Sequence, residues 1–390
     1  MLRWQTAGES HGQCLTAIVS GLPLGLPVDV GFLNRELRRR QAGYGRGGRM
    51  KIERDEAQIL SGVRHGKTIG APVTLQIENK DWTHWEDALP VEDVPGSEEK
   101  QRRLTQPRPG HADLAGALKF NLKDARYVVE RASARETAAR VAAGALAKLF
   151  LKPFGLEVLS HTVAIGTARL GRAARWEEIV KACEDADAEI RAVDAPLSGA
   201  MKKLIDQAIA ERDSLGGVFE VVAHNVPPGL GSHAHWDEKL DGRLAQAVMS
   251  IPAVKAVEVG AGVASAAAFG SEVHDEIGYD AAARRFTRPT NRAGGLEGGI
   301  SNGEDVVVRG YLKPISTLRR PLASVDLETK QPVKAAYERS DVCVVPAAGV
   351  IGEAMVALVL AAAAREKFGG DTLDEALSSF RAYAEQLNRY

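Results

Sequence analysis

The chain has 390 residues, of which 45% are hydrophobic and 26% charged, and its formal net charge is −1 with a pI of about 6.8. This composition is typical of a globular protein and excludes a disordered or collagen-like chain. A nearly neutral chain has no overall attraction to nucleic acid or to an anionic membrane, so a basic cluster within it acts locally.

Strand-like and helical segments alternate along the chain. Strands are predicted at 14–21, 72–79, 157–166, 216–226, 254–262 and 304–314. Helices are predicted at 32–40, 114–122, 133–151, 201–212, 237–249 and 350–368. At the third helix, Ser133 and Glu136 have the spacing of a capping box, and Pro153 with Gly155 ends the segment. No linker or repeat divides the chain, so we expect one domain over residues 1–390 with an α/β or α+β fold.

The cysteines Cys14, Cys183 and Cys343 are far apart and outside any CxxC pattern. This spacing favours reduced thiols in a reducing compartment. The N-terminal segment MLRWQTAGESHG lacks the apolar stretch of a signal peptide, and a proline and a glutamate interrupt the apolar run 342–364. We therefore expect a cytoplasmic protein without membrane association, in which this run is a strand end and a core helix.

The most basic segment lies between residues 35 and 54, where eight Arg or Lys stand against two Glu. Three interpretations fit it. It is an RGG-type segment that binds nucleic acid, a solvated basic loop, or part of a pocket for a small polyanion. In the third case Arg40, Arg46 and Arg49 supply planar bidentate donors for phosphate or carboxylate, and the glycines between them let the backbone come close.

Gly43, Gly45 and Gly48 in the same segment match the pattern GxGxxG. A dinucleotide-binding motif of this form follows a strand and opens a helix. Here the order is reversed, because a predicted helix precedes the glycines and a strand-like segment follows them. This context disfavours a pyridine-nucleotide oxidoreductase.

Two histidines lie in turns beside polar side chains. GESHG places Ser10 next to His11, and PRPGHAD places His111 close to Arg108 and before a helix. Histidine titrates near neutral pH, so both are candidates for general acid chemistry, although a single histidine is more often structural.

The segment GSHAHWD contains His233, His235 and Asp237. These are residue types that bind metals, but the start of a helix capped near Asp237 explains them better, and we expect no metal. The sequence contains no P-loop, HExxH or GxSxG motif, which disfavours kinases and common hydrolases.

Later segments add candidate ligands. In RSDVCVVP, Arg339 and Asp341 would lie on the same side of an extended segment, because strand side chains alternate. A surface ion pair between them explains this spacing as well. The glycine-rich segment 291–305 and the KPIST segment 313–317 offer backbone and hydroxyl groups suited to a phosphate or a flavin.

Eight segments then occur in one order across nearly the whole chain: GESHGQCLTAIVSGLP, RRRQAGYGRGGRM, PRPGHADLAG, ERASARETAARVAAGAL, AVKAVEVG, GGLEGGISNGE, KPIST and RSDVCVVP. Together they resemble the chorismate synthase family. The resemblance implies an α+β fold, a single large domain of helices sandwiched between mostly antiparallel sheets, and assembly as a homotetramer. It also implies a lyase that converts 5-enolpyruvylshikimate 3-phosphate to chorismate and phosphate by anti-1,4-elimination. This is the last common step of aromatic amino acid biosynthesis, and it uses reduced FMN without net redox change.

The resemblance also implies the site residues. His111 would protonate the leaving phosphate, His11 would protonate the reduced flavin or hold it in its competent state, and Asp341 with Ser10 would help the flavin accept the substrate proton. The substrate would bind to Arg40, Arg46, Arg49, Arg108, Arg135 and Arg339. FMN would lie against Arg131, Ala132, Ser133, Pro252, Ala253, Gly298, Lys313, Pro314, Ile315, Ser316, Thr317 and Arg339. Ala132 and Thr317 stand where the family often has serine.

A reductase domain does not fit in the chain, so we expect reduced FMN from an external flavin reductase. NADPH would be the indirect reductant, through such a reductase or through an activity of the same pocket. The alternatives from other classes are an RGG-type nucleic-acid binder and an NAD(P)-dependent oxidoreductase. A gel-shift experiment and a nicotinamide oxidation assay distinguish them.

Overall fold

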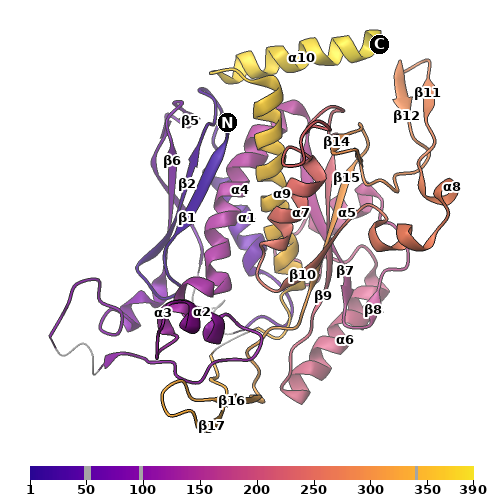
Figure 1. Cartoon of the computed structure of the whole chain (residues 1–390). Coiled ribbons are helices and arrows are strands. Elements are labelled where there is room, and N and C mark those ends of the chain that lie inside the picture. The colour runs from indigo at the N-terminus through magenta and orange to yellow at the C-terminus, as the bar shows by residue number, and fades with distance from the viewer. Residues whose placement is uncertain (48–53, 96–99, 339–340) are drawn as a thin grey trace.

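The computed structural model describes residues 1–47, 54–95, 100–338 and 341–390. Two sheets enclose a layer of helices (Figure 1). The first sheet has the order β1 (Arg3–Ala7), β2 (Cys14–Ser20), β6 (Val73–Glu78) and β3 (Ala57–Ser61). The second has the order β10 (Val254–Val259), β15 (Val306–Leu312), β9 (Gly217–His224), β7 (Glu157–Ile165) and β8 (Ala168–Arg169). Each of these strand pairs is antiparallel, so the α+β sandwich expected from the sequence is confirmed.

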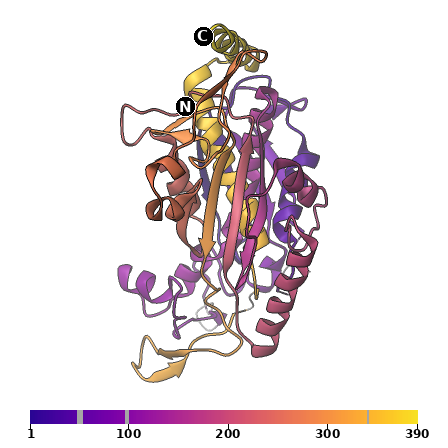
Figure 2. The ribbon, with the colours of Figure 1, turned by 90° about the vertical axis from the view of Figure 1, so that its right-hand side faces the viewer.

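Three long helices fill the space between the sheets. They are α1 (Val30–Gln41), α4 (Thr137–Leu151) and α9 (Val345–Phe368), with α7 (Leu240–Met249) beside α9. The other helices are α2 (Asp113–Lys119), α3 (Arg126–Ala132), α5 (Trp176–Cys183), α6 (Ala195–Glu211), α8 (Gly270–Val273) and α10 (Leu373–Arg389). Figure 2 looks onto the second sheet, with α6 along one edge and the hairpin of β16 (Ala323–Val325) and β17 (Pro332–Lys334) at the bottom.

Short elements connect these layers. The two-stranded pairs are β4 (Val63–Arg64) with β5 (Lys67–Thr68), β11 (Gly278–Asp280) with β12 (Arg285–Thr287), and β13 (Leu296–Glu297) with β14 (Ile300–Ser301). The 3₁₀ turns are η2 (Lys80–His84), η4 (Ala134–Glu136), η5 (Lys152–Phe154) and η6 (Gly262–Ala267).

All six predicted strands and six predicted helices occur, with shifted ends. Two predicted helix caps are wrong. Glu136 does not turn back to the Ser133 amide, because its carboxylate accepts hydrogen bonds from Thr6 and Arg140 instead, and α4 begins only after the 3₁₀ turn η4. Likewise α7 begins at Leu240, three residues after Asp237, and its cap position carries no side-chain hydrogen bond.

Small residues let the central helices pack closely. A Cβ atom at Gly144 of α4 would lie 2.3 Å from the Cβ of Ala354 of α9, and one at Gly352 would lie 2.6 Å from the Phe219 ring of β9. One hydrophobic core cluster includes residues of both sheets and of all three central helices. This common core supports the expectation of a single domain over residues 1–390, which stays a prediction.

Helix α9 is the one helix in the described part of the chain whose length and composition would let it cross a membrane, but most of its apolar window is buried inside the protein. It is therefore the core helix that the sequence predicts for this apolar run.

A network of buried charges lies inside this layer. Glu353 of α9, which is fully buried, accepts hydrogen bonds from Arg39 of α1, Lys148 of α4 and Ser160 of β7. Glu36 of α1 also accepts from Arg39 and Lys148. Two carboxylates, those of Glu36 and Glu353, thus balance the positive charges of Arg39 and Lys148. Burial alone raises the pKa of Glu353, but the two cations outweigh it and hold this pKa well below the usual range.

We expect the change Glu353→Ala to lower the free energy of unfolding by about 3–5 kcal/mol, because two buried cations lose a counter-charge. The matched control is Glu366→Ala on the same helix, whose ion pair with Arg243 is partly exposed and is worth at most about 1 kcal/mol. Urea unfolding of both variants and of the wild type measures the difference. Equal losses in the two variants would contradict the structural role of the network.

The same network makes a prediction about pH. A carboxyl group whose pKa is lowered by folding stabilises the protein above its unfolded pKa, about 4.3 for glutamate. This contribution is lost as the pH falls from that value through the lowered folded pKa. The wild type should therefore lose more stability than Glu353→Ala when unfolding is compared at neutral pH and below pH ~4.

Candidate active site

Most segments that carry the predicted site residues meet at the lower end of the sandwich in Figure 1. The C-terminus of α1, the N-terminus of α4, helices α2 and α3 and the β16–β17 hairpin lie there. Arg49 and Arg339 lie outside the described residues.

The first group of polar residues surrounds the buried carboxylate of Asp55, and we call it the Asp55 cluster. Arg40, at the end of α1, donates from Nη1 to Asp55 over 3.2 Å and from Nε to Thr137 over 3.0 Å. Arg135, before α4, donates to the other Asp55 oxygen and to Asn79. Both guanidinium groups are buried and are thereby fixed against the sheet and the helix. The structure thus brings Arg40 and Arg135 together on one carboxylate.

Positive charge is crowded in this cluster. Burial, with the nearby charges of Arg135 and Arg46, outweighs the attraction of Asp55 and lowers the pKa of Arg40 to about 10. Arg46 lies beside Asp341, with 3.2 Å between Nε and Oδ2, and donates to the backbone oxygen of Arg40. Among the residues that the structure describes here, three guanidinium groups face two carboxylates, and a bound anion would relieve the repulsion among the guanidinium groups.

The basic loop also packs against the protein itself. Gly45 has a φ of +81°, and a Cβ atom there would lie 2.8 Å from Ile205 of α6. Its carbonyl accepts a hydrogen bond from the amide of Val342, and the Gly47 amide donates to Asp341. The described part of the loop thus needs its glycines to fit against residues 341–343, and α1 precedes them, opposite to the order of a dinucleotide-binding motif.

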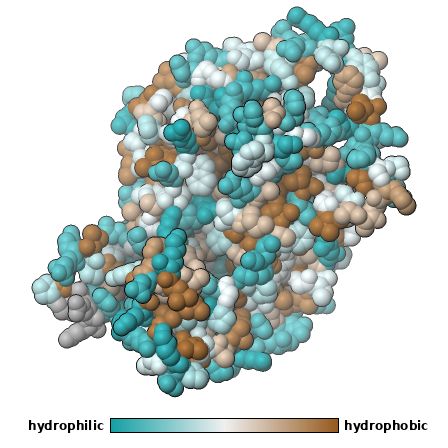
Figure 3. Space-filling model, in the orientation of Figure 1, coloured by the Kyte–Doolittle hydropathy of each residue, from teal (hydrophilic) through white to brown (hydrophobic). Residues whose placement is uncertain are grey.

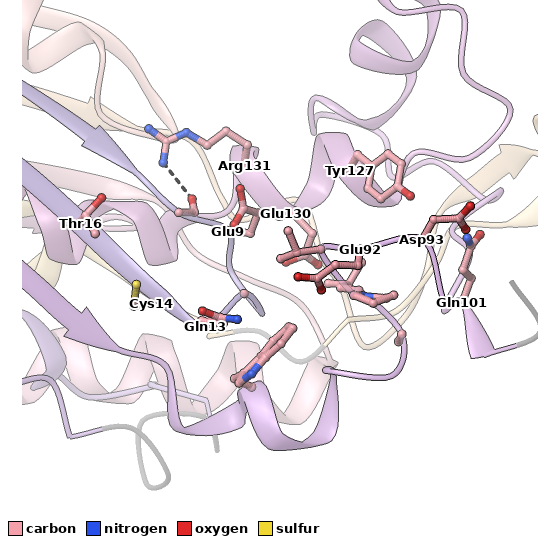
Figure 4. A pocket seen from close by; sticks show the side chains of 17 residues that line it. Glu9, Gln13, Cys14, Thr16, Glu92, Asp93, Gln101, Tyr127, Glu130 and Arg131 are labelled. Atoms are coloured by element: carbon pink, nitrogen blue, oxygen red, sulfur yellow. Dashed lines mark hydrogen bonds between the residues drawn. The ribbon is translucent and has the colours of Figure 1, made fainter. Parts of the chain in front are cut away.

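The loop between β1 and β2 lies against the end of α3. Ser10 is buried, and its Oγ lies 3.0 Å from the Oγ of Ser133. His11 Nδ1 lies 2.9 Å from Oε1 of Glu130. Arg131 is more exposed and donates to the carbonyls of Thr6 and Gly8, as Figure 4 shows for Gly8. The structure therefore joins Ser10 with Ser133, while Ala132 contributes the last residue of α3.

A cavity of about 870 Å³ opens beside this loop (Figure 4). Its carboxylates are Glu9, Glu92, Asp93 and Glu130, with Arg131 as its one basic lining residue among those described. A mainly acidic lining disfavours an anionic substrate. The arginine-rich loops fit such a substrate better than this cavity does.

The second group surrounds His111, and we call it the His111 cluster. Arg108 donates to Asp113 from its backbone amide and from two guanidinium nitrogens, and to Thr317 over 2.9 Å. Nδ1 of His111 lies within hydrogen-bond distance of Asp113 and 3.1 Å from Nη2 of Arg108. Burial raises the pKa of Asp113, but the bonds from His111 and Arg108 outweigh it and hold this pKa well below the usual range. An ionised Asp113 only accepts hydrogen bonds, so the His111 proton on this side belongs to Nδ1.

The KPIST segment meets the His111 cluster. Lys313 Nζ and Ser316 Oγ both donate to the carbonyl of Gly110 over 2.8 Å, and the Lys313 amide donates to Ala253. A Cβ atom at Gly110 would lie 3.3 Å from Ser316 Oγ. Burial, with the charge of Lys255, lowers the pKa of Lys313. An ammonium and a hydroxyl at one point suit the phosphate of a nucleotide-like cofactor such as FMN.

The remaining predicted cofactor residues lie in two places. Pro252 and Ala253 follow α7, and Ala253 has a φ of +72°, which is strained for alanine. Pro314 and Ile315 continue the KPIST segment. Gly298 lies apart from Pro252 and Ala253. Its neighbour Gly299 accepts a hydrogen bond from the first residue of α7, whereas Pro252 and Ala253 follow the last one, and the helix is about 15 Å long.

No group of three or more metal-binding side chains occurs in the parts of the chain described here, including the segment with His233 and His235.

Sequence reasoning missed several residues of the site: Asp55, Asn79, Trp85, Asp113, Glu130 and Thr137. Asp113 had a readable signal, because it follows His111 by two residues at the start of a helix. Glu130 directly precedes the predicted Arg131–Ser133 segment. Asp55 and Trp85 are paired with residues far away in sequence, so no local pattern indicates them.

Comparisons with known proteins agree with these observations. The family model described as chorismate synthase matches residues 2–364. Chorismate synthases of Solibacter usitatus and Koribacter versatilis are 61% and 60% identical to the chain, with full coverage of both sequences in each case. A crystal structure of a chorismate synthase is similar with a TM-score of 0.80 at 42% identity, covering 100% of this chain and 99% of that one. The chain belongs to the chorismate synthase family.

Proposed function

We propose that the chain converts 5-enolpyruvylshikimate 3-phosphate to chorismate and phosphate. The observation that carries the proposal is the His111 cluster, where a histidine with a fixed proton lies beside a guanidinium, an ammonium and hydroxyl groups at one end of the molecule. The reaction removes a proton and a phosphate from the substrate and adds a second double bond to its ring, so substrate and products have the same oxidation level. Family membership supports the same reaction.

Reduced FMN, when bound, supplies the electron density that helps the carbon–oxygen bond of the leaving phosphate to break. The residues that would hold it are those of the KPIST segment with Ala253 and Pro252, together with Arg131, Ala132, Ser133 and Arg339. Lys313 and Ser316 supply the donor set that a flavin phosphate needs.

His111 is the proposed general acid. Because Asp113 accepts from Nδ1, the ring faces a reacting molecule with Nε2, and a proton delivered from there neutralises the departing phosphate. Arg108 is held on the same carboxylate, so its charge stays close to the developing negative charge. Asp113 thereby fixes both groups.

The Asp55 cluster is the proposed site for the carboxylates of the substrate. Arg40 and Arg135 have internal partners, so their positions are set before a ligand binds. With Arg46 they create a positive potential where burial strengthens electrostatic interactions. Preorganised charges of this kind bind an anion without a large ordering cost.

We also propose assembly as a homotetramer. Figure 3 shows hydrophobic side chains at the right-hand edge, over the arm of α8, β11 and β12, where Phe269, Ile277 and Tyr279 are exposed. Gly298 lies apart from the KPIST segment of its own chain. If it contacts a flavin bound at a KPIST segment, that segment would have to belong to another subunit. An external flavin reductase, NADPH as the indirect reductant and a cytoplasmic location stay predictions.

We expect chorismate to form only with reduced FMN, and the flavin not to be consumed. The measurement is an anaerobic assay with dithionite-reduced FMN and 5-enolpyruvylshikimate 3-phosphate that follows chorismate absorbance and flavin absorbance together. Turnover under air without a reductant, or one flavin oxidised for each chorismate formed, would contradict the proposed reaction.

We expect His111→Ala to lower kcat about 10²–10⁴-fold, the range for a lost general acid, while FMN binding changes little. Asp113→Asn should also lower kcat, because the amide does not hold the Nδ1 proton as the carboxylate does. Single-turnover rates measure the loss in the chemical step, and FMN titration measures any change in cofactor binding. Near-normal turnover of His111→Ala would reduce His111 to a structural residue.

We expect Arg46→Lys to raise the KM of the substrate, because the ammonium keeps the charge but loses the planar two-point geometry. Arg46→Ala should raise it further. The matched control is Arg38→Lys on α1, whose guanidinium pairs with Asp187 at the exposed surface. If Arg46→Lys and Arg38→Lys both have the wild-type KM, Arg46 does not bind the substrate.

A further inference from the structure

Glu130 of α3 makes several contacts with the loop that carries Ser10 and His11. The backbone oxygen of Glu130 accepts from the Ser10 amide over 2.9 Å, and its Oε2 accepts from the His11 amide over 2.8 Å. Its Oε1 lies 2.9 Å from Nδ1 of the His11 ring. Glu130 thus fixes the loop backbone and the imidazole at once.

The charge of Glu130 determines where the His11 proton lies. Burial raises the pKa of Glu130, but the hydrogen bonds and charge of His11, together with Arg126, outweigh it and lower this pKa. The carboxylate is therefore ionised at neutral pH and only accepts hydrogen bonds. Because the Glu130 oxygen cannot donate, the proton between the two groups belongs to Nδ1 of His11.

An indole holds the ring from one face. Trp85, which is buried, stacks on His11 with 4.0 Å between ring centroids and 21° between the planes. The guanidinium groups of Arg102 and Arg126 lie 4.2 Å and 5.1 Å from the Trp85 ring. Trp85 is thus itself fixed by neighbours, and it restricts tilting of the imidazole.

We infer that Glu130 and Trp85 are positioning residues that keep His11 in the Nδ1–H form with its ring in one orientation, so that His11 exchanges protons through Nε2. This inference rests on the proposed function and on the role that the family resemblance implies for His11, which would protonate the reduced flavin or hold it in its competent state. It adds two residues that touch neither substrate nor cofactor in the proposal and that act through His11.

The His11–Glu130 pair resembles the way Asp113 holds His111. In both cases an ionised carboxylate on or beside a short helix accepts from Nδ1. Both proposed catalytic histidines therefore face the reacting molecules with the same nitrogen. A carboxylate that fixes the tautomer of a reactive histidine contributes strongly to turnover in enzymes with this arrangement.

The first test measures the tautomer directly. Protein labelled with ¹⁵N-histidine is examined by long-range ¹H–¹⁵N spectra at alkaline pH, with the His11 signals assigned by their loss in His11→Asn. The wild type should show His11 as Nδ1–H. Glu130→Gln should add the Nε2–H form, because an amide can donate as well as accept.

The chain offers a matched control for each change. Nε2 of His161 and Glu220 form a buried pair at 2.9 Å in the second sheet, so Glu220→Gln removes another buried carboxylate that faces a histidine, without altering the His11 signals. Trp176 stacks on His224 with 4.6 Å between centroids, so Trp176→Leu is the control for Trp85→Leu.

The second test is kinetic. With reduced FMN, Glu130→Gln should lower kcat at least about 10-fold while the substrate KM and FMN affinity stay close to the wild type. Trp85→Leu should lower kcat as well, and Trp85→Phe should recover most of it because phenylalanine still stacks. Glu220→Gln and Trp176→Leu should keep the wild-type kcat.

Three results would overturn the inference while leaving the proposed function intact. They are a wild-type tautomer in Glu130→Gln, a wild-type kcat in a Glu130→Gln protein whose tautomer has changed, and equal losses in Trp85→Phe and Trp85→Leu. If Glu130→Gln does not fold, the kcat values of Trp85→Leu and Trp85→Phe alone test the inference. A wild type that makes no chorismate would refute the proposed function, and the tautomer would still be measurable.

Discussion

The arrangement of the central helices depends on one buried carboxylate. Glu353 is fully buried, and an unpaired charge in such a place would be strongly destabilising. It is compensated only when Arg39 of α1, Lys148 of α4 and Ser160 of β7 lie in one place. Apolar packing would allow the helices to slide along one another, whereas this network fits one relative position. The interaction therefore specifies how the layers are aligned as well as holding them together.

That alignment reaches the site through neighbouring residues of α1. Arg39 points to Glu353, and the next residue, Arg40, donates to Asp55 and Thr137. The backbone oxygen of Arg39 in turn accepts from the buried Arg191. A shift of α1 along its axis would thus disturb the buried network and the Asp55 cluster together. The fold fixes the charges of the site by the same means that it uses to fix its core.

The sequence predicts the regular layers well and the site only in part. Strand β15 alternates buried and partly buried residues, so its pattern is readable, whereas α3 buries Arg126 and Glu130 and gives no apolar periodicity. Helix α10 was missed although Thr372 and Glu375 form a true capping box. His111 and the arginines could be found because they lie in collinear motifs. Glu130 and its partner His11 are 119 residues apart, and no local rule predicts such a pairing.

The position of α9 in the chain has a consequence for synthesis. This helix lies between the two sheets, yet it begins only at residue 345 of 390. The strands of both sheets, α1 and α4 therefore leave the ribosome before the helix that fills the space between them. Until then Arg39 and Lys148 lack one of their two carboxylate partners, and the inner faces of β7 and β9 lack their covering. The nascent chain can form local hairpins early, but its core closes only after α9 has been synthesised.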